Sequence, residues 1–280
     1  MRINEEQLRH YEEQGYLLLP GCFSAAEVEA VRSQLPSVLG RDGRGHIAEK
    51  EGEKVRSVYG AHLENETFRR LSLHPRLVGP STQMLGGGVY VYQVKINAKM
   101  AFGGDLWEWH QDYIYWRNLD GMPAPRVTNA ALFLDDVTEF NGPMYLIPGS
   151  HKEGCFSLPD RDRDSARVRQ LYDAYRDAGD WISSLTAELK YSFDRESIAA
   201  LVGRYGLVSA KAPAGSVLYF HPDIVHASPH NISPHDRVSV VVTYNSVENI
   251  PRPKGEPRPE FLVGRNHEPV VPVGDGALLQ

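Results

Sequence analysis

The chain has 280 residues, of which 41% are hydrophobic and 24% charged, and its formal net charge is −6. It is long enough to bury a sizeable core, and its composition is that of an ordinary globular protein. The negative charge and the lack of a basic run argue against a nucleic-acid partner, because phosphates require clustered Lys and Arg. No apolar stretch is long enough to cross a bilayer or to act as a signal segment. We expect a single domain over residues 1–280 that acts on a small molecule in the cytoplasm, and the oligomeric state stays open.

The chain contains two cysteines, Cys22 and Cys155, which are far apart and form no Cys-x-x-Cys motif. This spacing predicts neither a disulfide framework nor a thiolate zinc site. A metal ion bound by this protein would therefore be held by nitrogen and oxygen ligands.

The first third of the chain is predicted to be mainly helical. A helix is expected over residues 4–14, with Gly15 placed where a left-handed residue favours a helix end. A short strand over residues 16–20 follows, and the next helix begins at Ser24, which opens a sequence with capping-box spacing. A further helix is expected over residues 66–85.

The rest of the chain is predicted to be rich in strands. The expected strands cover residues 89–99, 107–113, 129–135, 144–148, 215–220, 224–226 and 237–244. Residues 141–143 form a turn into the fourth of these strands, and residues 149–151 are expected to close that hairpin. The proline-rich tail from Asn249 is expected to wrap the surface.

Residues 155–208 interrupt the strand pattern and predict a helical insertion or lid, with helices at about 162–178 and 198–202. Short strands separated by Gly and Pro turns are typical of a jelly-roll barrel. The predicted fold class is therefore mainly β with flanking helices. Its core would be a double-stranded β-helix of the jelly-roll, cupin-like type, with N-terminal helices and the helical insertion added to it.

The strand over residues 89–99 has one markedly polar face. Because side chains alternate along a strand, Gln93, Lys95 and Asn97 share this face. If both faces are covered, two amides and an ammonium become buried, which is costly unless they meet a ligand. An edge strand with one solvated face is the alternative that this stretch alone leaves open.

His110 and Asp112 are separated by one residue, so in an extended strand their side chains point to the same side. They supply two thirds of the facial triad of two histidines and one carboxylate. This triad holds non-haem Fe(II) and leaves positions open for oxygen and a co-substrate. The pair alone is a weak signal, because His-x-Asp often arises by chance.

His226 follows a short apolar strand and is the candidate for the third ligand. Arg237 and Ser239 lie on the next strand with their side chains on one face. A buried Arg requires a partner, and a carboxylate is suited to the planar guanidinium, with the Ser hydroxyl as a further donor. A dicarboxylate with a keto-acid end on the iron and its far carboxylate on Arg237 is 2-oxoglutarate.

With His110, Asp112, His226 and Arg237 in this order, the chain resembles the phytanoyl-CoA dioxygenase family of Fe(II)/2-oxoglutarate oxygenases. Within this family it resembles bacterial hydroxylases of free amino acids of the proline and leucine type, and more distantly the ectoine hydroxylases. The matching stretches are residues 89–99, 109–113, 120–122, 141–143, 148–149 and 242–245. The resemblance covers most of the chain from about residue 50 to residue 265.

The resemblance implies a role for each of several residues. The implied iron ligands are His110, Asp112 and His226. The residues implied to bind 2-oxoglutarate are Arg237, Ser239, Gln93, Lys95 and Asn97. Trp116 corresponds to an aromatic residue that borders the substrate pocket in this family. The candidates for binding the carboxylate and ammonium of a substrate, by position or by resemblance, are Arg56, His62, Arg117 and Asp120.

The implied activity is the O2-dependent hydroxylation of an unactivated carbon of a free L-amino acid, with 2-oxoglutarate converted to succinate and CO2. Related halogenases have a small residue in place of the carboxylate ligand, so Asp112 favours hydroxylation. Ectoine, or a carrier-bound or acyl small molecule, is the alternative substrate. The alternatives from other classes are a catalytically silent barrel and a zinc hydrolase. A silent barrel that binds metal or a small acid as a sensor would be expected to lack one ligand or Arg237, and none is lost here. A zinc hydrolase is disfavoured because no general base stands beside the triad.

Overall fold

The computed structural model describes the chain apart from residues 41–42, 44, 50–53, 159–181, 183–184 and 186–188. Its larger sheet contains β1 (Tyr16–Leu19), β2 (His46–Ala48), β3 (Val55–Tyr59), β4 (Val89–Lys99), β6 (Val127–Phe133), β9 (Val217–Phe220) and β11 (Arg237–Ser246). Its smaller sheet contains β5 (Trp107–His110), β7 (Met144–Leu146), β8 (Val208–Ala210) and β10 (His226–Ser228). The helices of the described residues are α1 (Glu5–Gln14), α2 (Ala25–Arg32), α3 (Leu35–Leu39), α4 (Ala61–Glu64), α5 (Glu66–Ser72), α6 (Pro75–Leu85), α7 (Tyr113–Asp120), α9 (Arg195–Tyr205), η1 (Ser150–Glu153) and η4 (Ala277–Leu279).

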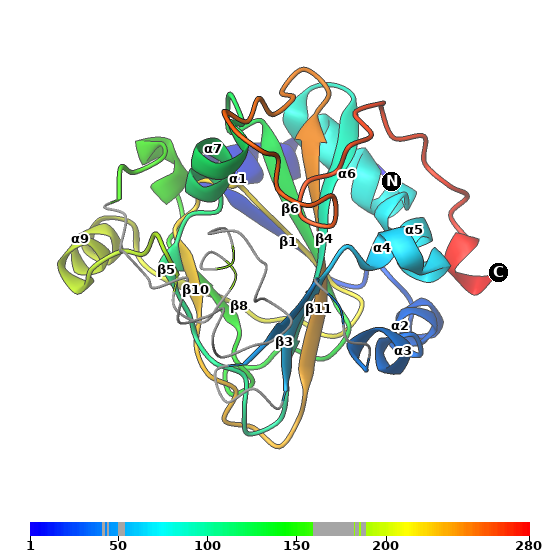
Figure 1. The fold of residues 1–280 in the computed structure, drawn as a ribbon. Coiled ribbons are helices and arrows are strands. Elements are labelled where there is room, and N and C mark those ends of the chain that lie inside the picture. The colour runs from blue at the N-terminus through cyan, green and yellow to red at the C-terminus, as the bar shows by residue number, and fades with distance from the viewer. Residues whose placement is uncertain (41–42, 44, 50–53, 159–181, 183–184, 186–188) are drawn as a thin grey trace.

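Two antiparallel sheets form the centre of the molecule, and helices from the first third of the chain lie along one side of the larger sheet (Figure 1). The strand order is β1-β9-β6-β11-β4-β3-β2 in the larger sheet and β5-β10-β7-β8 in the smaller one. This arrangement confirms the predicted class, which is mainly β with flanking helices.

The first helices begin where their capping residues predict. The side chain of Asn4 accepts a hydrogen bond from the backbone N–H of Gln7, and α1 ends at Gly15, which has a φ of 79°. Ser24 and Glu27 form the capping box that opens α2. These are local interactions within a few residues, so the sequence pattern alone was sufficient to find them.

The prediction of a single helix over residues 66–85 was wrong, because the structure has two helices there, α5 and α6. The break lies at Leu73 and His74, directly before Pro75. Proline has no backbone N–H and disfavours helical geometry in the residue before it, so it begins a new helix instead of continuing the old one.

Strand alternation gives the larger sheet two different faces. On the outer face, Ile96 of β4 with Val240 and Val242 of β11 are buried in one cluster with apolar side chains of α1, α2, α5 and α6. The opposite face carries Asn129 and Thr243, which are partners in the register of β6 and β11. The helices therefore cover the apolar face, and the polar face is left to form a site.

β4 is not an edge strand, since it pairs with β11 on one side and with β3 on the other. Gln93 and Lys95 consequently lie on an enclosed face of the sheet, and Gln93 is buried. The alternative of a solvated edge is excluded. Enclosing these polar groups is costly unless a ligand or a hydrogen-bond partner lies beside them.

Two local predictions in the strand-rich half were wrong. Residues 144–148 form no hairpin closed at residues 149–151, because β7 pairs with β8 and β10, and Ser150 begins η1. The strand predicted over residues 224–226 begins only at His226. In both cases short apolar runs fitted several partners, and long-range pairing decided between them.

The predicted insertion at residues 155–208 is described only in part. α9 confirms a helix around residues 198–202, whereas the helix expected at 162–178 lies outside the described residues. The C-terminal tail runs along β4, where the backbone N–H groups of Gly264 and Val270 donate to carbonyls of that strand. None of the described helices has the length and apolar character needed to cross a membrane.

Candidate active site

His110, Asp112 and His226 come together beside the smaller sheet. His110 ends β5, His226 begins β10, and the two residues are partners in the register of these strands. Nε2 of His110 lies 3.6 Å from Oδ1 of Asp112, and Nε2 of His226 lies 3.9 Å from the same oxygen. One ligand atom from each residue lies within 4.8 Å of the other two, which is close enough for all three to share one metal ion.

The strand geometry predicted for His110 and Asp112 was wrong, although their side chains do converge. β5 ends at His110, and Asp112 has helical backbone angles (φ −72°, ψ −38°) directly before α7. The backbone N–H groups of Asp112 and Tyr113 donate to the carbonyl of Pro222 at 3.0 and 3.1 Å. This contact with the loop before β10, and not strand alternation, directs the carboxylate toward the histidines.

Both histidines are oriented for metal binding through Nε2. Nδ1 of His110 lies 2.6 Å from the carbonyl of Glu108, and Nδ1 of His226 lies 3.0 Å from the carbonyl of Ile224. Because a carbonyl only accepts, each Nδ1 carries a proton, which leaves Nε2 as the nitrogen of each ring that can bind a metal. Burial lowers the pKa of His226 to about 4, which keeps this ring neutral near pH 7. Two imidazoles and a carboxylate are the ligand set that fits an Fe(II) ion.

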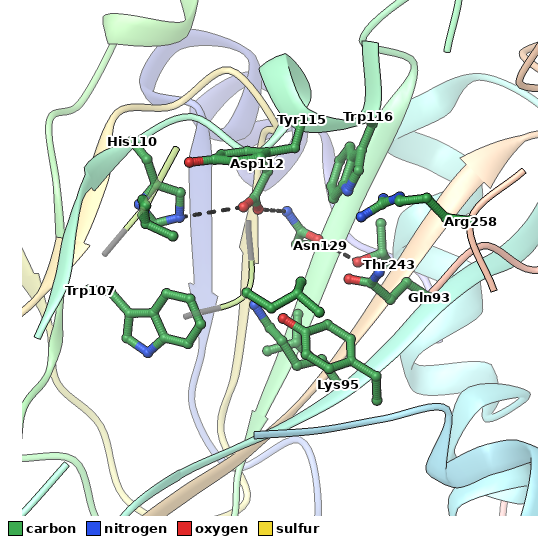
Figure 2. A pocket seen from close by; sticks show the side chains of 14 residues that line it. Gln93, Lys95, Trp107, His110, Asp112, Tyr115, Trp116, Asn129, Thr243 and Arg258 are labelled. Carbon is green, nitrogen blue, oxygen red and sulfur yellow. Dashed lines mark hydrogen bonds and ion pairs between the residues drawn. The ribbon is translucent and has the colours of Figure 1, made fainter. Parts of the chain in front are cut away.

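The carboxylate of Asp112 is fixed by a chain of hydrogen bonds (Figure 2). Its Oδ2 accepts from Nδ2 of Asn129 at 2.9 Å, and Oδ1 of Asn129 accepts from the Thr243 hydroxyl at 2.7 Å. Burial alone would raise the pKa of Asp112, but His226 and His110 hold this pKa well below its ordinary value. The carboxylate is therefore ionised and ready to bind a cation.

A cavity opens beside Asp112 and His110 (Figure 2). Its polar lining residues are Gln93, Lys95, Asn129, Thr243 and Arg258. Its aromatic lining residues are Tyr59, Trp107, Tyr115 and Trp116, and its aliphatic ones are Leu185, Leu189 and Val241. The structure thus brings five of the residues singled out in the sequence to one cavity, namely His110, Asp112, Gln93, Lys95 and Trp116.

Lys95 places an ammonium group among the aromatic side chains of this cavity. Its Nζ lies 5.0 Å from the ring centroid of Trp107 and 5.9 Å from that of Tyr59. Burial lowers the pKa of Lys95, and the nearby Asp112 opposes this change. The group can attract an anion bound next to Asp112, whereas Gln93 is already engaged and donates to the carbonyl of Leu262 at 2.7 Å.

Arg258 lines the cavity and was missed in the sequence, because it lies in a proline-rich tail without strand or helix periodicity. Its guanidinium donates to Oδ1 and Oδ2 of Asp120 at 2.7 and 2.6 Å, and the hydroxyl of Tyr92 also donates to this carboxylate. Asp120 is buried and does not line the cavity. Asp120 therefore holds the guanidinium of Arg258 in place. Of these two residues, only Asp120 was singled out in the sequence.

The polar face continues beyond the cavity toward Arg237. Asn97 and Ser239 are partners in the register of β4 and β11, as are Lys99 and Arg237. Arg237 is buried and donates to the Ser228 hydroxyl at 3.1 Å and to the carbonyl of Gly142. No ion pair links its guanidinium to a carboxylate of the described residues, and burial lowers its pKa to about 10.

The buried polar atoms of this region that lack a hydrogen-bond partner among the described residues include Nε of Arg237 and Oδ1 of Asn97. The Ser239 hydroxyl lies 3.5 Å from NH1 of Arg237. An unpaired buried cation with a neighbouring hydroxyl suits one end of a dicarboxylate. The residues therefore fit 2-oxoglutarate, although Arg237, Ser239 and Asn97 do not line the cavity itself.

Three further candidates for substrate binding do not line the cavity. Arg56 is buried, pairs with Glu49 at 3.1 Å and stacks on the ring of Trp107 with its guanidinium carbon 3.8 Å from the centroid. His62 lies on α4, and burial lowers its pKa to about 4. Arg117 donates to its neighbour Asn118 at 3.2 Å. Arg56 supports a cavity wall from behind, and the structure does not bring His62 or Arg117 to the cavity.

The described part of the insertion supplies an apolar wall. The backbone N–H of Leu189 donates to Oε2 of Glu108 at 3.0 Å. The hydroxyl of Tyr115 both donates to the carbonyl of Tyr191 and accepts from its N–H, at 2.8 and 3.0 Å. These bonds fasten the segment to β5 and α7, so that the side chains of Leu185 and Leu189 face the cavity.

The loop before His226 contains a carboxyl group that the site does not use. Asp223 is 2% exposed, and its Oδ1 has no hydrogen-bond partner among the described residues. Burial raises its pKa to about 7, against the favourable charge of Arg117. The carboxyl group is thus partly neutral near physiological pH.

Asp223→Asn should therefore change the pH dependence of stability. Because the folded-state pKa lies above the ordinary value of 3.8, the folded protein binds more protons than the unfolded chain between about pH 4 and about pH 7. The stability of the wild type should fall as pH rises through this window, and Asn should remove that fall. Thermal unfolding at several pH values measures this pH dependence of stability. The control is Glu256→Gln, because the side chain of Glu256 is exposed. Parallel pH profiles of Asp223→Asn and wild type would contradict the assignment.

Comparison with known proteins agrees with the fold and the site. The family model described as phytanoyl-CoA dioxygenase (PhyH) matches residues 11–239. L-proline trans-4-hydroxylase of Streptomyces griseoviridis is 40% identical over 268 residues, which cover 94% of this chain and 93% of that protein. The ectoine dioxygenase of Halomonas elongata is 33% identical over 274 residues, which cover 95% of this chain and 77% of that protein.

A solved structure, EctD from S. alaskensis with 2-oxoglutarate and 5-hydroxyectoine, superposes with a TM-score of 0.80 at 28% identity. The match covers 99% of this chain and 89% of that one. The fold and the site together define an Fe(II)/2-oxoglutarate-dependent dioxygenase, with Fe(II) and 2-oxoglutarate as its cofactors. The chain belongs to the phytanoyl-CoA dioxygenase family, and it is a hydroxylase.

Proposed function

We propose that this protein hydroxylates an unactivated carbon of a free L-amino acid of the proline or leucine type. The observation that carries the proposal is Arg258, a buried guanidinium at the wall of the cavity whose lining also includes Asp112, Leu185 and Leu189. A guanidinium held by Asp120 and an apolar wall in one cavity suit a molecule with a carboxylate and a short hydrocarbon side chain. The 40% identity to an L-proline trans-4-hydroxylase supports the same substrate class.

In this proposal the whole chain forms one oxygenase domain with a jelly-roll core, and His110, Asp112 and His226 hold the iron. Arg237 and Ser239 bind the far carboxylate of 2-oxoglutarate, while Asn97, Gln93 and Lys95 lie along the path between that carboxylate and the iron. When bound, Fe(II) and 2-oxoglutarate would supply the oxidising chemistry: 2-oxoglutarate would be oxidised to succinate with loss of CO2, one oxygen atom of O2 would enter succinate, and the other would enter the new hydroxyl group.

The contribution of the protein is to position the substrate and to keep water away from the reacting carbon. Arg258 fixes the carboxylate of the amino acid, and it is itself held rigidly by two hydrogen bonds to Asp120. Trp116, which packs edge-on against Tyr92 with ring centroids 5.5 Å apart, forms a wall of the same cavity. Leu185 and Leu189 close it on the apolar side.

Ectoine is the alternative substrate, because it also carries a carboxylate and because relatives with 30–34% identity are ectoine dioxygenases. A carrier-bound or acyl substrate is less suited to the cavity, since an ester or thioester has no free carboxylate for Arg258. A silent binding protein is disfavoured, because all three candidate iron ligands converge.

The test is anaerobic reconstitution with Fe(II) and 2-oxoglutarate, followed by exposure to oxygen with single free L-amino acids or ectoine. We expect succinate together with a hydroxylated proline, leucine or related amino acid. The matched control is the amide of the accepted amino acid. If Arg258 binds the carboxylate, the kcat/KM of the amide should be lower than that of the acid by roughly 30-fold or more, because loss of a buried charge contact costs about 2–5 kcal/mol. Hydroxylation of ectoine alone would replace the proposal, and equal turnover of acid and amide would remove the role of Arg258.

A further inference from the structure

The two oxygens of the Asp112 carboxylate have different surroundings. Oδ1 is the oxygen that lies 3.6 and 3.9 Å from the Nε2 atoms of the two histidines. Oδ2 accepts the hydrogen bond from Asn129. An ion bound between the two imidazoles therefore meets Oδ1, while Oδ2 is already occupied by a hydrogen bond.

The amide of Asn129 is itself held in one orientation. A side-chain amide can present either its oxygen or its nitrogen to a neighbour, and the two choices have opposite effects on a carboxylate. The Thr243 hydroxyl donates to Oδ1 of Asn129, which turns the NH2 group toward Asp112. Asn129 is 1% exposed and Thr243 is 2% exposed, so bulk water does not compete for the hydrogen bond between them.

The two supporting residues come from the rigid part of the fold. Thr243 of β11 and Asn129 of β6 are partners in the register of the larger sheet. Asp112, in contrast, lies in a turn outside either sheet. The hydrogen bonds thus tie the ligand from a turn to two central strands (Figure 2).

From this geometry we propose that Asn129, oriented by Thr243, is a positioning residue that keeps Asp112 a one-oxygen ligand of the metal. With Oδ2 withheld, Asp112 would supply a single oxygen beside the two imidazoles, and the remaining positions of a bound ion would stay open to the co-substrate and oxygen. The inference rests on the proposed iron ligands. It assigns the outer partners of Asp112, which determine how the carboxylate binds.

The test compares Thr243→Val, which removes the donor at nearly constant shape, with Thr243→Ser, which retains it. Asn129→Leu removes the amide, and Asp112→Ala removes the ligand. Co(II) is titrated into each metal-free protein, and its affinity and visible absorption spectrum are measured, because the spectrum responds to coordination number. Thermal unfolding of the metal-free proteins shows that each variant is folded.

We expect Thr243→Val and Asn129→Leu to weaken Co(II) binding by roughly 10–100-fold and to change the spectrum of the bound ion, whereas Thr243→Ser matches wild type. The double variant with Asn129→Leu and Thr243→Val should bind Co(II) no more weakly than Asn129→Leu alone, since both changes act on one hydrogen-bond chain. If Asn129→Leu does not fold, the pair of Thr243 variants decides.

Equal affinity and equal spectra for Thr243→Val and Thr243→Ser would overturn the inference. Its failure is distinguishable from failure of the ligand assignment. If Asp112→Ala binds Co(II) like wild type, the ligand assignment itself is wrong. If Asp112→Ala loses Co(II) binding but Thr243→Val does not, only the positioning role of Asn129 and Thr243 falls.

Discussion

Asp112→Ala is expected to abolish succinate formation and substrate hydroxylation. Asp112 is the only carboxylate of the metal-binding cluster in the described part of the chain, and its Oδ1 lies 3.6 and 3.9 Å from the Nε2 atoms of the two imidazoles. Loss of a ligand should exceed the roughly 10–100-fold effect that loss of an outer partner typically has. Succinate and product are measured after anaerobic loading with Fe(II) and 2-oxoglutarate, followed by oxygen.

His230→Ala is the matched control for this prediction. His230 lies four residues after His226, and its side chain is 55% exposed and 3.9 Å from Asp105. It should keep wild-type turnover, whereas His226→Ala should behave like Asp112→Ala. If Asp112→Ala hydroxylated the substrate as the wild type does, the assignment of the iron ligands would be wrong, whatever the behaviour of the histidine variants.

Arg237→Ala is expected to raise the KM for 2-oxoglutarate sharply while leaving metal affinity nearly unchanged. The guanidinium is buried, has an unpaired Nε and pairs with no carboxylate of the described residues. Its removal therefore leaves no buried carboxylate of these residues without a partner. Truncation of a buried charge contact costs about 2–5 kcal/mol, which corresponds to a rise of roughly 30-fold or more. Initial rates at several 2-oxoglutarate concentrations and Co(II) titration measure the two quantities.

Arg237→Lys should restore part of the affinity, because it keeps the charge but loses the planar fork. Arg117→Ala is the control, since Arg117 lies on α7 and does not line the cavity. Its KM for 2-oxoglutarate should equal that of the wild type. An unchanged KM in Arg237→Ala would exclude this residue as the anchor of the co-substrate, and Lys95 would become the next candidate.

Local features were predicted correctly because their causes lie within a few residues. The capping box at Ser24 and the left-handed Gly15 required only neighbouring side chains and backbone. The polar row that contains Gln93 and Lys95 required only the two-residue period of a strand. The same local reasoning failed at Pro75, where a helical pattern of apolar residues was interrupted by one residue without an N–H.

The substrate end of the site could not be predicted in this way. Arg258 reaches the cavity from an irregular tail, and Asp120, which was expected to meet a substrate, instead holds that arginine. The side chains of these two residues meet across 138 positions of the chain. No periodicity links such residues, so only the packing of the tail against α7 and β4 brings them together.

By itself the sequence determined which side chains are available: two histidines, a carboxylate and a buried arginine in an order typical of one oxygenase family, on strands whose faces follow from alternation. The tertiary structure alone decided how Asp112 is aimed, by a turn held to Pro222, and which atoms surround its two oxygens. The physical reason is that side-chain identity and strand period are local properties. The contacts of Asn129 with Thr243, and of Arg258 with Asp120, exist only after distant strands and the tail have packed.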